Sequence, residues 1–132
     1  MIGIVDYRAG NVTSVARALR FLDEPCEVTD RPDVLDRAGR IVFPGVGAAG
    51  EAMANLRRTG LDDWLKKWVQ EGKPVLGICL GTQVILSESE EDGVTPCLGI
   101  VPGVVKRFPE DLQTDGRRLK IPHMGWNTVK FR

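Results

Sequence analysis

Short apolar runs alternate with segments of helical periodicity along the first 86 residues, and this alternation limits the folds that the chain can adopt. The apolar runs cover residues 2–5, 40–43 and 74–78, with a weaker run at 27–29. The segments of helical spacing lie at 12–22, 52–56, 61–69 and 80–86. Strands that alternate with helices form a parallel sheet covered by helices on both faces. The sequence therefore predicts an α/β fold with a mostly parallel sheet.

Two residues mark helix boundaries within this pattern. Asn11 precedes the first helical segment, where its side chain can accept hydrogen bonds from the free N–H groups of the first turn. Gly72 follows the segment 61–69 and is typical of a helix end. We expect one helix to begin after Asn11 and another to end before Gly72.

The pattern changes after Ser87. An acidic run, Glu88 to Asp92, is interpreted as a solvated loop. Residues 98–108 and 121–131 are both strand-like and are separated by a polar loop, so we expect an antiparallel extension near the C-terminus. No repeat or linker divides the chain, and residues 1–132 are predicted to form a single domain.

Composition excludes several classes of function. The 18 basic residues balance 18 acidic ones without a block of either sign, which argues against partners such as nucleic acid or a membrane surface. The first residues lack a basic leader and a long apolar run, so a cytoplasmic location is predicted. Three cysteines without CxxC spacing disfavour both a disulfide framework and a zinc site. No metal and no cofactor are expected.

The strongest chemical signal is the pentapeptide Gly77-Ile78-Cys79-Leu80-Gly81, which lies between a predicted buried strand and a predicted helix. A nucleophile in such a strand-to-helix turn points outward, and flanking glycines leave room for tight packing and for substrate. The start of the helix favours the thiolate form of Cys79, and the N–H of Leu80 would face a developing oxyanion. The alternative is an ordinary buried cysteine, but this placement favours a catalytic nucleophile.

Pro44-Gly45-Val46-Gly47 also ends a predicted strand. Its glycines permit backbone conformations that turn main-chain N–H groups towards a ligand, so a second oxyanion or substrate contact is one interpretation. A tight turn after a strand is the other. Cys26 and Cys97 each follow a proline without a comparable turn, and both are assigned to structure.

The region near the C-terminus holds the single histidine, His123. It is the one candidate base for Cys79 within the sequence, although a lone histidine is more often structural. Trp126, with Met124 and Phe131, could form an exposed apolar surface for a partner, because Trp and Met are enriched at interface cores. Packing of these side chains within the core is the alternative.

Taken together, these segments resemble the class I glutamine amidotransferases of flavodoxin-like build, and within them the glutaminase subunits of imidazole glycerol phosphate synthase. The elbow, extended through Thr82 and Gln83, is shared by the whole superfamily. The opening Asp6-Tyr7-Arg8-Ala9-Gly10-Asn11, the Pro44–Gly47 loop and Pro122-His123-Met124-Gly125-Trp126-Asn127 are similar to this subunit family in particular. A cysteine hydrolase or a stress-related protein of similar build would share the elbow but lack the other motifs.

The resemblance implies a reaction. Cys79 would attack the side-chain amide of glutamine, release ammonia and form a thioester that water then cleaves. The N–H of Leu80 and the backbone of Val46 and Gly47 would form the oxyanion hole, and the Val46–Gly47 backbone would have to reorient first. Gln83 and Gly47 would hold glutamine. Thr82, where the family often has methionine, is expected to be tolerated.

The resemblance also implies a partner. Ammonia would pass to a (β/α)₈ cyclase subunit of imidazole glycerol phosphate synthase in histidine biosynthesis. Met124, Gly125, Trp126 and Asn127 would lie at that interface, and His123 is better interpreted as part of the interface than as a base.

One motif of the family has no counterpart in this sequence. The relatives continue with a histidine and, two residues later, a glutamate, which complete the catalytic triad. By the resemblance, residues 1–132 are an incomplete amidotransferase domain and hydrolysis by this chain alone should be very weak. Two alternatives stay open: a non-catalytic module that binds the cyclase, and an amidotransferase subunit of another pathway.

Overall fold

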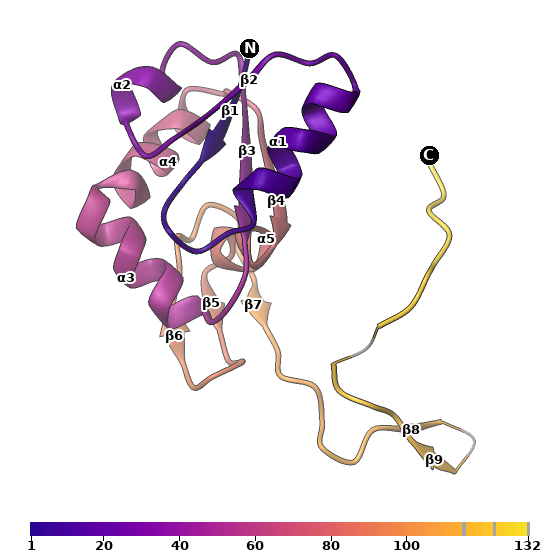
Figure 1. Cartoon of the computed structure of the whole chain (residues 1–132). Coiled ribbons are helices and arrows are strands. Elements are labelled where there is room, and N and C mark those ends of the chain that lie inside the picture. Colours follow the sequence, from indigo (N-terminus) through magenta and orange to yellow (C-terminus); the bar gives the residue numbers. More distant parts are fainter. Residues whose placement is uncertain (115, 123, 132) are drawn as a thin grey trace.

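A four-stranded parallel sheet forms the centre of the protein (Figure 1). The computed structural model describes residues 1–114, 116–122 and 124–131. The strand order is β2-β1-β3-β4. The bounds are β1 (Ile2–Val5), β2 (Cys26–Thr29), β3 (Arg40–Gly45) and β4 (Val75–Cys79). The sheet confirms the predicted parallel strands, including the weak one at 27–29.

Helices cover both faces of this sheet, as predicted (Figure 1). Their bounds are α1 (Val12–Phe21), α2 (Pro32–Leu35), α3 (Ala49–Thr59), α4 (Leu61–Gln70) and α5 (Leu80–Ile85). Helix α1 packs on one face, where Ala16 joins a small core with Ile2, Ile4 and Val42. The other helices pack on the opposite face. The short α2 was not predicted, because a single turn carries no detectable periodicity.

The larger core lies between the sheet and helices α3, α4 and α5. Its fully buried side chains come from strands and helices alike, and include Phe43, Met53, Leu56, Leu65, Trp68 and Leu80. The burial of such large apolar groups is the main favourable term in folding. This core holds the start of α5 against the end of β3. The candidate nucleophile, Cys79, lies at the end of β4 and directly precedes α5.

The predicted helix boundaries are confirmed. The side chain of Asn11 accepts a hydrogen bond from the N–H of Ser14 at 3.2 Å, which satisfies one free donor at the start of α1. Helix α4 ends at Gln70, and Gly72 then adopts a positive φ of 74°. The N–H of Gly72 donates to the carbonyl of Val69, so the end of α4 is closed as expected.

The predicted antiparallel extension is only partly correct. Strands β5 (Glu88–Ser89), β6 (Thr95–Pro96) and β7 (Val104–Val105) form a small sheet in which β5 pairs antiparallel with β6 but parallel with β7. A further antiparallel hairpin joins β8 (Gln113–Thr114) and β9 (Arg117–Arg118). The interpretation of residues 88–92 as a solvated loop was wrong at Glu88 and Ser89, since Ser89 is fully buried.

The prediction of two long strands near the C-terminus was wrong. Within 98–108 only Val104–Val105 forms a strand, because Gly99 adopts a positive φ and Pro102 has no N–H to donate to a ladder. Within 121–131, none of the described residues, 121, 122 and 124–131, forms a strand. Apolar residues alone do not make a strand without a neighbouring strand to pair with.

The segment after β7 extends away from the sheet (Figure 1). Trp126 is 104% exposed and Met124 is 87% exposed, and Phe131 is also exposed. The alternative that these side chains pack within the core was therefore wrong, and the exposed apolar surface is the arrangement observed.

Strand β4 lies at an edge of the sheet, where Leu76 and Ile78 are exposed on the face that α1 covers only in part.

Candidate active site

Cys79 lies at the junction of β4 and α5, as the pentapeptide predicted. Its backbone has φ 55° and ψ −118°, a conformation that residues other than glycine rarely adopt. Such a conformation costs on the order of 1–3 kcal/mol and persists only when the surrounding structure enforces it. The thiol is free and exposed. The alternative of an ordinary buried cysteine was wrong, and the strained, outward-pointing side chain is typical of a nucleophile elbow.

The glycines of the elbow are required by close backbone contacts. A Cβ on Gly81 would overlap the carbonyl oxygen of Phe43 in β3. A Cβ on Gly77 would lie 2.9 Å from the backbone nitrogen of Thr82. The first turn of α5 can therefore approach the sheet closely only because neither position carries a side chain. This packing holds Cys79 at the carboxyl end of β4.

The loop that follows β3 lies next to the elbow, because Gly45 is the register partner of Cys79. Val46, the residue after Gly45, donates its N–H to the carbonyl of Ala9 at 2.9 Å. Gly47 adopts a positive φ of 94°. Val46 and Gly47 therefore directly follow the residue that pairs with Cys79 in the sheet, but the Val46 N–H is already engaged by the carbonyl of Ala9. Its role as an oxyanion donor stays a prediction, which requires that this hydrogen bond break.

Gln83 follows Cys79 by one helical turn and lines a cavity of about 600 Å³. Its Oε1 atom is buried and has no hydrogen-bond partner among the residues that the structure describes. Glu91, Lys106, Arg107 and Arg118 also line this cavity. An amide beside carboxylate and cationic groups is suited to a zwitterionic amino acid. Gln83 was predicted from the sequence as a site residue, but the charged residues were not, because their proximity depends on the turns between β5 and β9.

Tyr7 is a second group that the sequence analysis did not single out. Its side chain is only 1% exposed, and its ring packs against Phe43 with 5.0 Å between the ring centroids. Burial, with a smaller contribution from the nearby Cys79, raises the pKa of Tyr7 well above its ordinary value. The phenol is therefore neutral at physiological pH. Its only signal in the sequence was its place in the segment that follows β1.

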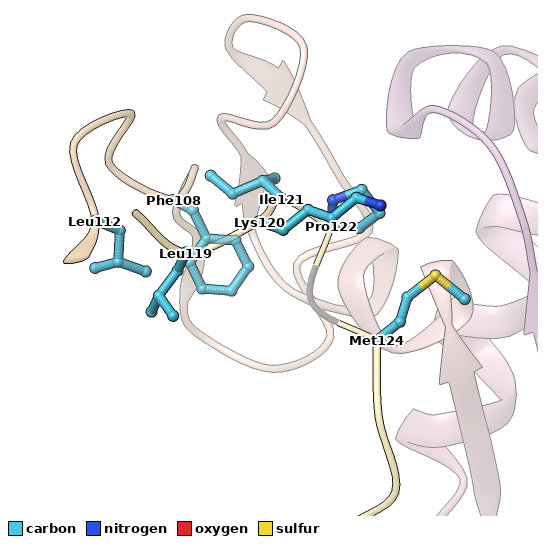
Figure 2. Close-up of a pocket in the computed structure, with 7 residues that line it drawn as sticks. All are labelled: Phe108, Leu112, Leu119, Lys120, Ile121, Pro122 and Met124. Atoms are coloured by element: carbon cyan, nitrogen blue, oxygen red, sulfur yellow. The ribbon is translucent and has the colours of Figure 1, made fainter. Parts of the chain in front are cut away.

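An apolar cavity of about 560 Å³ lies in the C-terminal segment and not at the elbow. Figure 2 shows the side chains of Phe108, Leu112 and Leu119 close to one another, with Met124 on the other side of the opening. Gly125, Trp126 and Asn127 continue this segment and are exposed. His123, which was predicted as part of the same interface, lies outside the described residues.

The other cysteines have surroundings that suit structural roles. Cys26 is half-buried on β2 and its Sγ lies 3.8 Å from the carbonyl oxygen of Ala16. Cys97 is also half-buried, and burial raises the pKa of its thiol. Among the described residues, no group of three His, Cys, Asp or Glu side chains is placed to hold a metal ion. None of the described helices is long and apolar enough to cross a membrane.

A sequence model of the family described as glutamine amidotransferase class-I matches residues 3–130. The chain belongs to this family. A solved crystal structure of a glutamine amidotransferase superposes on it with a TM-score of 0.67, at 22% identity, over 78% of this chain and 54% of the other. That likeness supports the class-I amidotransferase fold that the resemblance implied.

Three relatives at higher identity are each described as imidazole glycerol phosphate synthase subunit HisH. The protein of Desulfovibrio desulfuricans is 50% identical over 98% of this chain and 60% of its own length. That of Halalkalibacterium halodurans is 48% identical over 100% of this chain and 61% of its own length. A Nitratidesulfovibrio vulgaris protein is 52% identical over 98% of this chain and 61% of its own length. This amidotransferase chain thus spans about 60% of the length of the relatives that it matches.

Proposed function

We propose that this amidotransferase chain is the cysteine-bearing part of a glutaminase subunit of imidazole glycerol phosphate synthase. Cys79 attacks the amide carbon of glutamine, ammonia leaves, and water cleaves the thioester to give glutamate. A cyclase subunit receives the ammonia. Residues 1–132 are proposed to belong to one glutamine amidotransferase domain of that subunit, and the protein is proposed to be cytoplasmic.

The single observation that carries the proposal is the geometry of Cys79. An exposed thiol in a strained turn, directly before α5 and next to the Pro44–Gly47 loop, is the arrangement that acyl transfer requires. The Leu80 N–H supplies one oxyanion donor at the start of α5. Release of the Val46 N–H from Ala9 would supply the second. The cavity that Gln83 lines is not lined by Cys79, so glutamine is proposed as the substrate from the similarity to the amidotransferase relatives.

The partner is proposed from the C-terminal segment. Met124 and Trp126 are exposed, and Met124 borders the apolar cavity of Figure 2. An exposed Trp and Met beside an apolar depression are suited to a protein interface, because such side chains form interface cores. The similarity to HisH subunits points to the cyclase as the protein that covers this surface.

A non-catalytic module that binds the cyclase is the second candidate function. The observation that favours it is the exposed apolar surface around Met124 and Trp126, which suits binding of a partner whether or not Cys79 reacts. Binding of the cyclase without hydrolysis of glutamine would distinguish this function from the first.

The test is the release of glutamate from glutamine by this chain mixed with its cyclase subunit. Cys79→Ser is the matched control, because it keeps the size of the side chain and removes the thiol. The same assay is repeated with the chain extended to the length of the HisH relatives. Turnover that appears on extension and is lost in Cys79→Ser supports the glutaminase function.

Two results would contradict parts of this proposal. Turnover by the 132-residue chain at the rate of the extended protein would mean that its own residues complete the triad, with His123 as the base. Binding of the cyclase without turnover in either form would favour the non-catalytic module.

A further inference from the structure

The hydroxyl of Tyr7 is buried beneath the candidate active site without a hydrogen-bond partner in the part of the chain that the structure describes. A buried hydroxyl in this state has lost its hydrogen bonds to water and gained none in return, which is unfavourable. Phenylalanine would fill the same volume without that loss. Buried polar groups in native structures are nearly always paired, so this hydroxyl requires a specific explanation.

The hydroxyl lies where β3, the elbow and α5 meet. It occupies the space in which a side chain at Gly45 would begin, since a Cβ built on Gly45 overlaps the Tyr7 oxygen. The same Cβ position is 2.9 Å from the backbone nitrogen of Gly81 and 2.9 Å from the Cβ of Leu80. Gly45 is the register partner of Cys79. The hydroxyl is therefore in contact with the point from which the Val46–Gly47 loop leaves the sheet.

That loop must change its backbone conformation if the Val46 N–H is to face Cys79. The N–H is now bonded to the carbonyl of Ala9, two residues after Tyr7. Rotation of the Gly45–Val46 peptide would release the N–H from Ala9. The same rotation would turn the carbonyl of Gly45, which belongs to that peptide, and Gly45 is the residue against which the Tyr7 hydroxyl lies.

We propose that Tyr7 is a positioning residue for this loop, whose hydroxyl donates to the Gly45 carbonyl only after the Gly45–Val46 peptide has turned. The hydroxyl thus favours the conformation in which the Val46 N–H can stabilise an oxyanion. In this role Tyr7 acts through Gly45 and takes no part in the chemical step. The inference rests on the proposed glutaminase function for its effect on rate, but not for its effect on the loop.

The test compares Tyr7→Phe with Trp64→Phe. Trp64 is an aromatic residue of α4 whose Nε1 donates to Asp36 at 2.9 Å, so its substitution also removes one polar group from an aromatic ring, away from the elbow. Two quantities are measured in each variant. Hydrogen exchange of the Val46 amide reports how often its bond to Ala9 opens, and needs no turnover. Glutaminase kinetics are measured in whichever form of the protein turns over glutamine.

For Tyr7→Phe we expect a melting temperature equal to or above that of the original protein, because an unpaired buried hydroxyl is removed. The Val46 amide should exchange about tenfold more slowly, and kcat should fall about tenfold with KM unchanged, since one hydrogen bond of the turned state is lost. Trp64→Phe should lower the melting temperature and leave Val46 exchange and kcat unchanged.

Unchanged exchange of the Val46 amide in Tyr7→Phe would overturn the proposal. So would failure of Tyr7→Phe to fold, because the hydroxyl would then be needed in the present conformation. If the original protein shows no turnover that depends on Cys79, the glutaminase function fails, and the exchange measurement still decides the role of Tyr7 in the loop.

Discussion

The replacement of Gly81 by alanine tests whether the close approach of α5 to the sheet determines the position of Cys79. In most helices this change is favourable, because alanine exceeds glycine in helix propensity by about 1 kcal/mol. At Gly81, however, the new Cβ would overlap the carbonyl oxygen of Phe43. That oxygen belongs to the backbone of a central strand, which pairs with β1 on one side and β4 on the other. It cannot rotate away as a side chain would.

The magnitude follows from the difference between these two effects. Overpacking of a tight core costs about 1–3 kcal/mol, and contact with a fixed backbone atom belongs at the upper end of that range. After subtraction of the gain in helix propensity, we expect Gly81→Ala to lower the free energy of unfolding by about 2 kcal/mol. The displaced α5 would also move Cys79, so turnover that depends on this cysteine should be lost.

Gly50→Ala is the matched control. Gly50 is also a helical glycine, in α3, but a Cβ at this position meets only the Thr95 hydroxyl oxygen, at 3.8 Å. This is an ordinary contact, so the substitution should be neutral or stabilise the protein by up to about 1 kcal/mol. Urea denaturation of the two variants measures both changes. Equal stability of Gly81→Ala and Gly50→Ala, or full turnover by Gly81→Ala, would refute the packing argument.

Three further predictions concern the elbow, the first helix and Tyr7. Cys79→Gly should be more stable than Cys79→Ala by about 1 kcal/mol in urea denaturation, because glycine adopts φ 55° without strain; equal stability would show that the turn is relaxed. Asn11→Ala should lower the free energy of unfolding by about 1 kcal/mol, since it removes the hydrogen bond from the Ser14 N–H. Asn11→Ser should retain most of the original stability, because serine can also accept this hydrogen bond. The raised pKa of Tyr7 means that only the unfolded chain loses this proton near pH 10, so ionisation of Tyr7 leaves the free energy of unfolding unchanged below about pH 10 and lowers it as the pH rises further. Urea titrations between pH 9 and 11 should show a steeper fall for the original protein than for Tyr7→Phe, and identical slopes would contradict the burial of this hydroxyl.

The first 86 residues were predictable because their signals are local. Alternating apolar runs and helical periodicity placed all four strands of the main sheet, and also helices α1, α3, α4 and α5. Asn11 and Gly72 marked helix ends through capping chemistry that needs only neighbouring residues. The position of Cys79 between a strand and a helix was predictable for the same reason, since the pattern of strand, glycine, cysteine, glycine and helix is contained in a few consecutive residues.

The C-terminal third was not predictable in the same way. Residues 98–108 and 121–131 have the apolar content of strands, but a strand also needs a partner that offers free N–H and C=O groups. In the range 98–108 only Val104–Val105 pairs with another strand, β5. No residue in the described part of 121–131 lies in a strand. Pairing depends on residues distant in sequence, so side-chain pattern alone could not decide it.

The sequence by itself determined the main sheet, the longer helices that cover it and the position of Cys79 at the turn between a strand and a helix. Only the tertiary structure decided what surrounds that cysteine. The contact of Tyr7 with Gly45 and the bond between Val46 and Ala9 each join residues from different parts of the chain near the end of β3, which pairs with the end of β4. Such contacts arise when helices and loops pack on the completed sheet, where close packing and the burial of polar groups select one arrangement. Periodicity indicates which face of a helix or strand is buried, but not which atoms that face contacts.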